Sequence, residues 1–234
     1  LMQVRVHTGA GTSTLRILLS LCSYTSSTVY TCSQRCQDDS DTVREPLMDS
    51  RMAEATECEK LKKNALSQCP VVAFMFQKLE EHGCRVPDPS TFVSCHQCEN
   101  DLTGGFNTED NEIVLCQNHL VASKGMGQQN VNHTLVHELV HAFDQCRAHV
   151  EWGNCEHHAC SEVRAAGLSG ECDWKQELNR GHLNVAGQHQ RCVRRRAELS
   201  LLMNPNCQGS KAKDAVDAVF DRCYADTAPF EKRM

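Results

Sequence analysis

The sequence predicts an α+β domain in which a small antiparallel sheet is followed by several helices. Apolar residues recur at helical spacing on both sides of residues 92–116, while that range contains short apolar segments separated by turn residues. Sixteen cysteines are too many for a typical reduced cytosolic enzyme and favour a disulfide-rich fold in an oxidising compartment. A chain of 234 residues can bury one substantial core without a second domain.

The first 52 residues are expected to be an extension, and we place the domain itself at residues 53–234. Residues 1–37 contain three arginines and many serines and threonines but no acidic residue, a composition that resembles a transit peptide more than a secretory signal. Met48 and Met52 precede the first well-patterned segment, so an over-extended gene model explains the same residues. The extension is therefore expected to be disordered, targeting-like or misannotated.

The elements of the domain follow in order along the chain. Residues 54–82 suit one or two helices broken near Pro70, because proline cannot continue a helix that precedes it. Short strands are expected at residues 92–94, 104–107 and 112–116, with a turn between the last two. Further helices are expected at residues 132–146, 157–168, 192–202 and after Ser210, whose side chain can cap the last one.

Charge and hydropathy restrict the possible partners. A net charge of −6 argues against a nucleic-acid binder, which normally needs a basic excess. The best candidate for a membrane span, residues 17–22, is far shorter than the roughly 20 residues of a membrane-spanning helix, so any membrane contact is expected to be peripheral. The dense basic run Arg191–Arg196 is either a solvated helix face or a contact for acidic phospholipid headgroups.

The most informative stretch is His137-Glu138-Leu139-Val140-His141, the HExxH pattern of zinc proteases. It lies in an apolar segment that suits a helix capped by Asn132 and ending near Cys146. Residues i and i+4 share one face of a helix, so both imidazoles can reach one zinc ion while Glu138 accepts a proton from the attacking water. The pattern predicts a zincin-like metalloprotease domain; an ordinary amphipathic helix is the alternative.

A catalytic zinc ion needs a third protein ligand, and Glu162 on the next predicted helix is the first candidate. The alternative for Glu162 is a surface or salt-bridged carboxylate. His158, one turn earlier, is the leading substitute, or supports the site if Glu162 binds the metal. Asp144 could hydrogen-bond an imidazole and so select its tautomer. Arg164 could pair with a carboxylate or hold substrate, although an exposed arginine is the simpler interpretation.

Two further patterns leave alternatives open. Cys95 and Cys98, followed by Cys116 and His119, have the spacing of a structural zinc site, but the spread of the other cysteines favours disulfides, without defining their pairing. The strand at 112–116 precedes the HExxH helix, as does the edge strand to which zinc proteases add substrate. A buried structural hairpin is the equal alternative.

From about Cys58 to Phe230, the sequence resembles the mitochondrial inner-membrane zinc metalloproteases that process ATP synthase subunit 6 and assist its assembly. Its later segments are most similar to the fungal members, and its first 50 residues do not align with the family. Besides the run 137–147, the resemblance is carried by residues 104–106, 113–116, 158–172, 189–197, 204–207 and 225–230.

The resemblance implies a protein on the intermembrane-space side of the inner membrane, held there peripherally. It implies one catalytic Zn²⁺, with His137 and His141 as ligands and Glu138 as the proton acceptor. The implied partners are the subunit 6 precursor, which is matured, and intermediates in the assembly of the membrane sector of ATP synthase. The alternative function is a non-proteolytic assembly chaperone that uses the same zinc domain, because the two roles are separable in fungal members.

Overall fold

The computed structural model describes residues 41–86, 88–99, 101–120, 127–182 and 186–233, of which residues 41–49 are described as backbone alone. The elements are α1 (Asp41–Gln68), α2 (Pro70–Glu81), α3 (Pro89–Phe92), β1 (Val93–His96), β2 (Gly104–Asn107), β3 (Glu112–Cys116), α4 (Gln117–Leu120), α5 (Gly127–Ala148), α6 (Cys155–Leu168), α7 (Trp174–Asn179), α8 (Gln188–Leu201), a 3₁₀ turn (Pro205–Cys207) and α9 (Ser210–Ala225).

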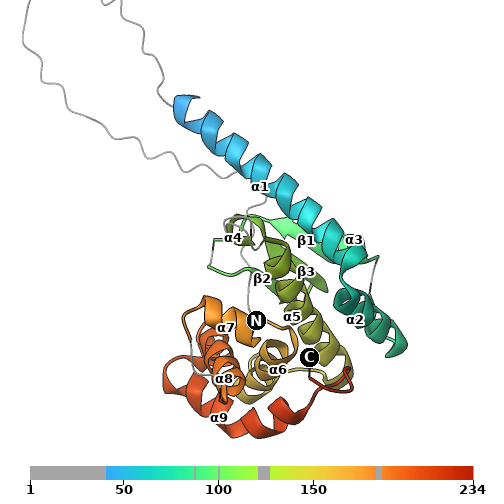
Figure 1. Cartoon of the computed structure of the whole chain (residues 1–234), viewed down its shortest axis with the longest axis vertical. Coiled ribbons are helices and arrows are strands. Elements are labelled where there is room, and N and C mark those ends of the chain that lie inside the picture. The colour runs from blue at the N-terminus through green and yellow to red at the C-terminus, as the bar shows by residue number, and fades with distance from the viewer. Residues whose placement is uncertain (1–40, 87, 100, 121–126, 183–185, 234) are drawn as a thin grey trace, which may run out of the picture.

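Helix α5 runs through the middle of the molecule and separates two halves (Figure 1). The sheet and the helices α1 to α4 lie on one side of it, and helices α6 to α9 lie on the other. Helix α5 contacts α1, α2, β2 and β3 in the first half and α6 in the second. Residues on α5 can therefore meet residues from both halves, which is what a site between them requires.

The first two helices are divided where the sequence predicts. Helix α1 ends at Gln68 and α2 begins at Pro70, with Cys69 in the extended conformation that a following proline favours. Helix α1 begins at Asp41, so residues 41–52 of the expected extension are helical, whereas residues 1–40 lie outside the described residues. The costly step in forming a helix is its nucleation, after which each added residue gains one backbone hydrogen bond, and this favours continuation of α1 beyond its packed part.

The sheet is mixed, so the prediction of an antiparallel sheet was wrong. Among the described residues β3 lies between the other two strands, antiparallel to β2 and parallel to β1. The disulfide Cys98–Cys116 ties the chain just after β1 to the end of β3, which suits two strands that point the same way. Sequence spacing identifies the β2–β3 hairpin but does not say on which side of it β1 lies.

Helix α5 is longer than predicted. It begins at Gly127, so Asn132 lies inside the helix and is not its cap. The side-chain oxygen of Asn132 instead accepts a hydrogen bond from Gln128 Nε2 at 2.9 Å. Buried apolar residues from Val131 onward pack one side of α5 against the first core.

Helix α6 lies between two hydrophobic cores. Its Ala165 and Leu168 belong to the core formed by α1, α2, the sheet and α5. Its Ala159, Val163 and Ala166 belong to the core formed with α8 and α9. The three alanines among these residues let neighbouring helices approach α6 closely, and α6 connects the two halves.

The remaining helices lie near the predicted ranges, with two differences. Helix α7 lies between the predicted helices at 157–168 and 192–202, where no helix was predicted. Ser210 is the first residue of α9 and does not cap it, because Gly209 occupies the capping position. Helix α6 is capped by Asn154, whose side chain accepts a hydrogen bond from the backbone N–H of Glu156 at 3.0 Å.

Six disulfides link the described cysteines, and Cys69 is the free cysteine among them. Cys95 pairs with Cys58 and Cys98 with Cys116, so the alternative of a structural zinc site is wrong. The other bonds are Cys84–Cys146, Cys155–Cys207, Cys160–Cys223 and Cys172–Cys192. Within the described parts of the chain, no helix has the length and apolar character needed to cross a membrane.

Candidate metal centre

Three side chains converge where α6 crosses α5. His137 and His141 lie one turn apart on α5, with ring centroids 4.8 Å apart. Glu162 reaches them from α6: its Oε2 lies 3.4 Å from His137 Nε2, and its Oε1 lies 3.6 Å from His141 Nε2. One ligand atom from each residue lies within 4.8 Å of the others. The structure thus assembles a possible His-His-Glu metal site from the three residues that the sequence predicts.

The state of Glu162 fits a bound cation. The residue is 1% exposed, and its Oε2 atom has no hydrogen-bond partner among the described residues. A buried carboxylate oxygen without a partner is costly, whereas a metal ion at this point would satisfy it. Two imidazoles and one carboxylate are also a donor set of catalytic zinc sites.

His137 is held by Glu171, a residue that sequence reasoning missed. His137 Nδ1 donates to Glu171 Oε1 at 2.9 Å, which leaves Nε2 directed toward Glu162. Arg196 binds the other carboxylate oxygen at 2.8 Å, and Arg180 donates to the Glu171 backbone carbonyl at 2.7 Å. Burial alone would raise the pKa of Glu171, but His137 and Arg196 together lower it to about 2. Glu171 therefore stays negative, as a group that orients His137 must.

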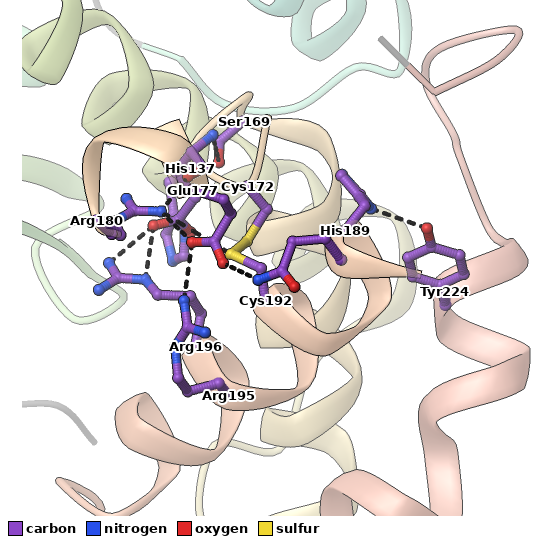
Figure 2. Close-up of a disulfide and its surroundings, with 12 residues drawn as sticks. His137, Ser169, Cys172, Glu177, Arg180, His189, Cys192, Arg195, Arg196 and Tyr224 are labelled. Atoms are coloured by element: carbon purple, nitrogen blue, oxygen red, sulfur yellow. Dashed lines mark hydrogen bonds and ion pairs between the residues drawn. A yellow bond between two sulfur atoms is a disulfide. The ribbon is translucent and has the colours of Figure 1, made fainter. Parts of the chain in front are cut away.

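A second carboxylate anchors the segment that carries Glu171. Glu177 is buried, and its Oε1 accepts hydrogen bonds from Arg180 and Arg195, each at 2.8 Å. Figure 2 shows these arginines and Glu177 around the Cys172–Cys192 disulfide, with His137 close by. The disulfide and the ion pairs fasten α7 and the residues before it to α8, and so fix the position of Glu171.

The arginines at the end of the basic run Arg191–Arg196 form ion pairs with other residues of this chain. Arg195 and Arg196 pair with the two buried glutamates, and Arg194 pairs with Asp217 at 2.8 Å. Arg194 also stacks on Phe220, with its guanidinium carbon 3.6 Å from the ring centroid. Ion pairing within the fold accounts for these arginines, and the sequence alone did not reveal it.

His141 is oriented through Ser161, which sequence reasoning also missed. Its Nδ1 lies 2.7 Å from Ser161 Oγ, and Ser161 in turn donates to Asp144 Oδ2 at 3.1 Å. The expectation that Asp144 bonds an imidazole directly was therefore wrong, because Asp144 faces Arg164. Arg164 Nε lies 3.0 Å from Asp144 Oδ1.

Arg164 is a buried structural residue, so the interpretation as an exposed arginine was wrong. Its side chain is 1% exposed and also binds the Asp226 backbone carbonyl at 2.6 Å and the Ala228 carbonyl. Arg164 thereby links the helix that carries Glu162 to the C-terminal segment. Its charge is matched by the carboxylates of Asp144 and Asp226.

His158 supports Glu162 and lies outside the three-residue cluster. Its Nε2 lies 3.2 Å from Glu162 Oε1, and its Nδ1 lies 2.9 Å from the side-chain nitrogen of Asn204. Asn204 is fully buried and also donates to the Trp152 carbonyl at 2.8 Å. The sequence left Glu162 and His158 as candidates for the third metal ligand. The geometry favours Glu162 as the ligand and His158 as its hydrogen-bond partner.

Glu138 lies on α5 beside β2 and is 6% exposed. Burial raises the pKa of Glu138 to about 7, although the neighbouring His137 lowers it. Strand β2 approaches α5 closely at Gly104, where a Cβ would lie 2.7 Å from Thr134 Cγ2 and 2.9 Å from the Val114 carbonyl oxygen. Glycine at this position therefore allows the strand to reach the helix next to Glu138.

A cleft of about 580 Å³ opens onto the cluster. Residues 101–104 form one part of its lining, and α5 contributes Glu138, both histidines and three more residues. The remaining lining residues come from α6 to α8 and from the segments between and after them. Strand β2 is the sheet edge beside this cleft, whereas β3 is central. The expectation that residues 112–116 form an open edge strand was wrong, because β3 is paired on both sides.

Replacing Glu171 by Gln is expected to weaken metal binding by roughly 10–100-fold, the usual cost of losing a partner that orients a metal-binding histidine. The amide keeps the size of the side chain but not the charge that holds His137 in place. Competition with a zinc-selective chelator would measure the affinity. Asp217→Asn, which removes an exposed carboxylate that pairs with Arg194, is the matched control. Equal affinity in both variants would contradict the role of Glu171.

Comparisons with known proteins place this chain among peptidases. The model of the Peptidase M76 family matches residues 56–231. Similar curated proteins include a "Mitochondrial inner membrane protease ATP23 homolog" of Xenopus laevis, 44% identical over 174 residues that make up 74% of this chain and 72% of the relative. The Homo sapiens protein of the same name is 42% identical over 74% of this chain and 68% of its own length.

A fungal relative, "Mitochondrial inner membrane protease atp23" of Schizosaccharomyces pombe, is 39% identical over 181 residues, 76% of this chain and 94% of the relative. No solved structure matches. The match to the family model covers most of the described domain, including the two helices that carry His137, His141 and Glu162. The chain therefore belongs to the Peptidase M76 family.

Proposed function

We propose that this protein is a zinc-dependent endopeptidase of the mitochondrial intermembrane space. We further propose that it matures the precursor of ATP synthase subunit 6 and promotes assembly of the membrane sector. The observation that carries the proposal is the convergence of His137, His141 and Glu162 beside Glu138 in one cleft. Membership of a peptidase family supports the reaction, and the names of the relatives support a location at the mitochondrial inner membrane.

In this proposal His137, His141 and Glu162 hold one zinc ion. Bound zinc supplies Lewis acidity, which activates water and polarises the carbonyl of the scissile amide. Glu138 accepts the proton of the attacking water and delivers it to the departing amine. Glu171 and Ser161 keep the two imidazoles in the tautomers that leave Nε2 free for the metal. An HExxH helix beside a small sheet supports a zincin-like assignment for the domain.

The proposed function is tested with purified protein and a peptide that spans the N-terminal region of the subunit 6 precursor. Zinc-loaded protein is expected to cut the peptide at one bond, chelator-treated protein to be inactive, and added zinc to restore cleavage. Mass spectrometry of the products would identify the bond. If zinc-loaded protein leaves the peptide intact but the same chain restores ATP synthase in cells that lack the endogenous protein, the peptidase proposal fails and the assembly role stands.

A further inference from the structure

Large exposed apolar side chains occur mainly on α7, on α8 and just after α8, and two of them line the cleft of the candidate metal centre. Among the described residues, six large hydrophobic side chains are exposed, and five of these lie between residues 174 and 203. These residues belong to α7, to α8 and to the turn that follows α8. The five are Trp174, Leu178, Leu199, Leu202 and Met203. Single exposed apolar residues need no explanation, so the informative ones are those that line a cleft.

Two of the five differ from the others in their position. Leu199 and Met203 line the same cleft as His137, His141 and Glu162, and are 52% and 40% exposed. They lie four residues apart, at the end of α8 and just after it. Arg196, one turn of α8 before Ser200, contacts Glu171, so this end of α8 is held against the metal centre.

Another part of the lining also offers apolar surface. Leu102 lies in the segment before β2 and packs against the small cluster of Cys98, Val114 and Cys116. The lining of the cleft therefore includes one apolar residue just before β2 and two from the end of α8 and the turn after it, together with the candidate metal ligands on α5 and α6. Ligand-binding clefts usually combine apolar surface with a few polar groups.

We propose that Leu199 and Met203 form a specificity subsite that receives an apolar side chain of the polypeptide substrate near the scissile bond. This inference rests on the proposed endopeptidase function and names the substrate feature that its cleft selects. A polypeptide is favoured over a lipid surface because these two side chains line a cleft that continues to the metal cluster. Trp174 and Leu178, which do not line it, provide matched exposed controls.

The test uses zinc-loaded full chain and variants of the subunit 6 precursor peptide in which each residue near the cut bond is replaced in turn by Leu, Ser or Lys. Wild type is expected to prefer Leu over Ser at one position by roughly 10–200-fold in kcat/KM, the range that an apolar pocket can discriminate. Leu199→Ser with Met203→Ser should remove most of that preference. Leu199→Glu should shift the preference toward Lys at the same position, because the new carboxylate attracts the ammonium group.

The controls separate failure of the subsite from failure of the peptidase. Trp174→Ser with Leu178→Ser should keep the wild-type preference. Because all four side chains are exposed, each variant is expected to fold, which circular dichroism would check. If wild type cuts no peptide, the proposed function fails, and binding of the same fluorescent peptides, measured by anisotropy, still decides whether the subsite exists.

An unchanged preference in the Leu199/Met203 variant, in cleavage or in binding, would overturn the inference. A second result would overturn the inference and indicate a membrane-binding surface instead. In that case the Leu199/Met203 variant and the Trp174/Leu178 variant would both sediment less with phosphatidylcholine–cardiolipin vesicles than wild type does, while their peptide preference would stay as in wild type. Loss of peptide preference without loss of vesicle binding is the expected outcome.

Discussion

Glu138→Gln is expected to leave a folded protein that binds one zinc ion per chain and cuts the subunit 6 precursor about 10²–10⁴-fold more slowly, the range of general acid–base catalysis. Glutamine has nearly the same shape but cannot accept a proton from water. The ligands His137, His141 and Glu162 are untouched, so zinc content should match wild type. Metal analysis together with single-turnover cleavage of the precursor peptide would measure both properties.

The same variant divides the two proposed roles in cells that lack the endogenous protein. Wild type should restore both subunit 6 maturation and assembled ATP synthase, whereas Glu138→Gln should restore assembly alone. Glu112→Gln, which changes a partly exposed carboxylate on β3, is a control that should behave as wild type. Normal maturation by Glu138→Gln would show that this glutamate is not the proton acceptor and would remove the main support for the mechanism.

Glu162→Gln is expected to weaken zinc binding by more than the roughly 10–100-fold that loss of a supporting residue costs, because it removes the negative ligand itself. The buried site would then combine a divalent cation with two neutral imidazoles and a neutral amide, which compensates the ion poorly. Activity should fall with zinc content. Titration with a zinc-selective chelator would give the affinity, and circular dichroism would verify the fold.

His158→Gln is the matched comparison, since His158 contacts Glu162 and lies outside the cluster of candidate ligands. It should lower zinc affinity only within the range of a supporting residue and leave one zinc ion bound at saturation. The reverse result, full zinc binding by Glu162→Gln and its loss in His158→Gln, would make His158 the third ligand. That alternative is the one that the sequence leaves open.

Local patterns predicted much of this protein. The spacing of His137 and His141 places both on one helix face whatever surrounds the helix, because that relation depends on backbone geometry alone. The break before Pro70 and the hairpin of β2 and β3 are local in the same sense. The helix that carries Glu162 could also be predicted, and Glu162 could be named as a candidate ligand. Its distance to the two histidines could not be predicted.

The partners of the cluster depended on tertiary structure. Glu171 reaches His137 across 34 residues of sequence, and Ser161 reaches His141 across 20, with no spacing rule to connect them. Asp144 was expected to bond an imidazole, and Arg164 to pair with a carboxylate or to hold substrate. Packing turned the two toward each other and buried both, so the carboxylate pairing of Arg164 is confirmed, but its partner could not be named from the sequence. Long-range hydrogen bonds of this kind depend on how helices cross, which periodicity does not encode.

The sheet order and the disulfides also separate what the sequence predicted from what only the tertiary structure decided. Sixteen cysteines indicated an oxidised fold, and the strand at 112–116 was correctly located, but neither showed that β3 is central or that Cys98 pairs with Cys116. Composition and periodicity describe each segment by itself, so they determine which helices and strands form and which residues share a face. Which segments become neighbours is decided only when α5 and α6 pack into their two cores, because burial selects one arrangement of the whole chain.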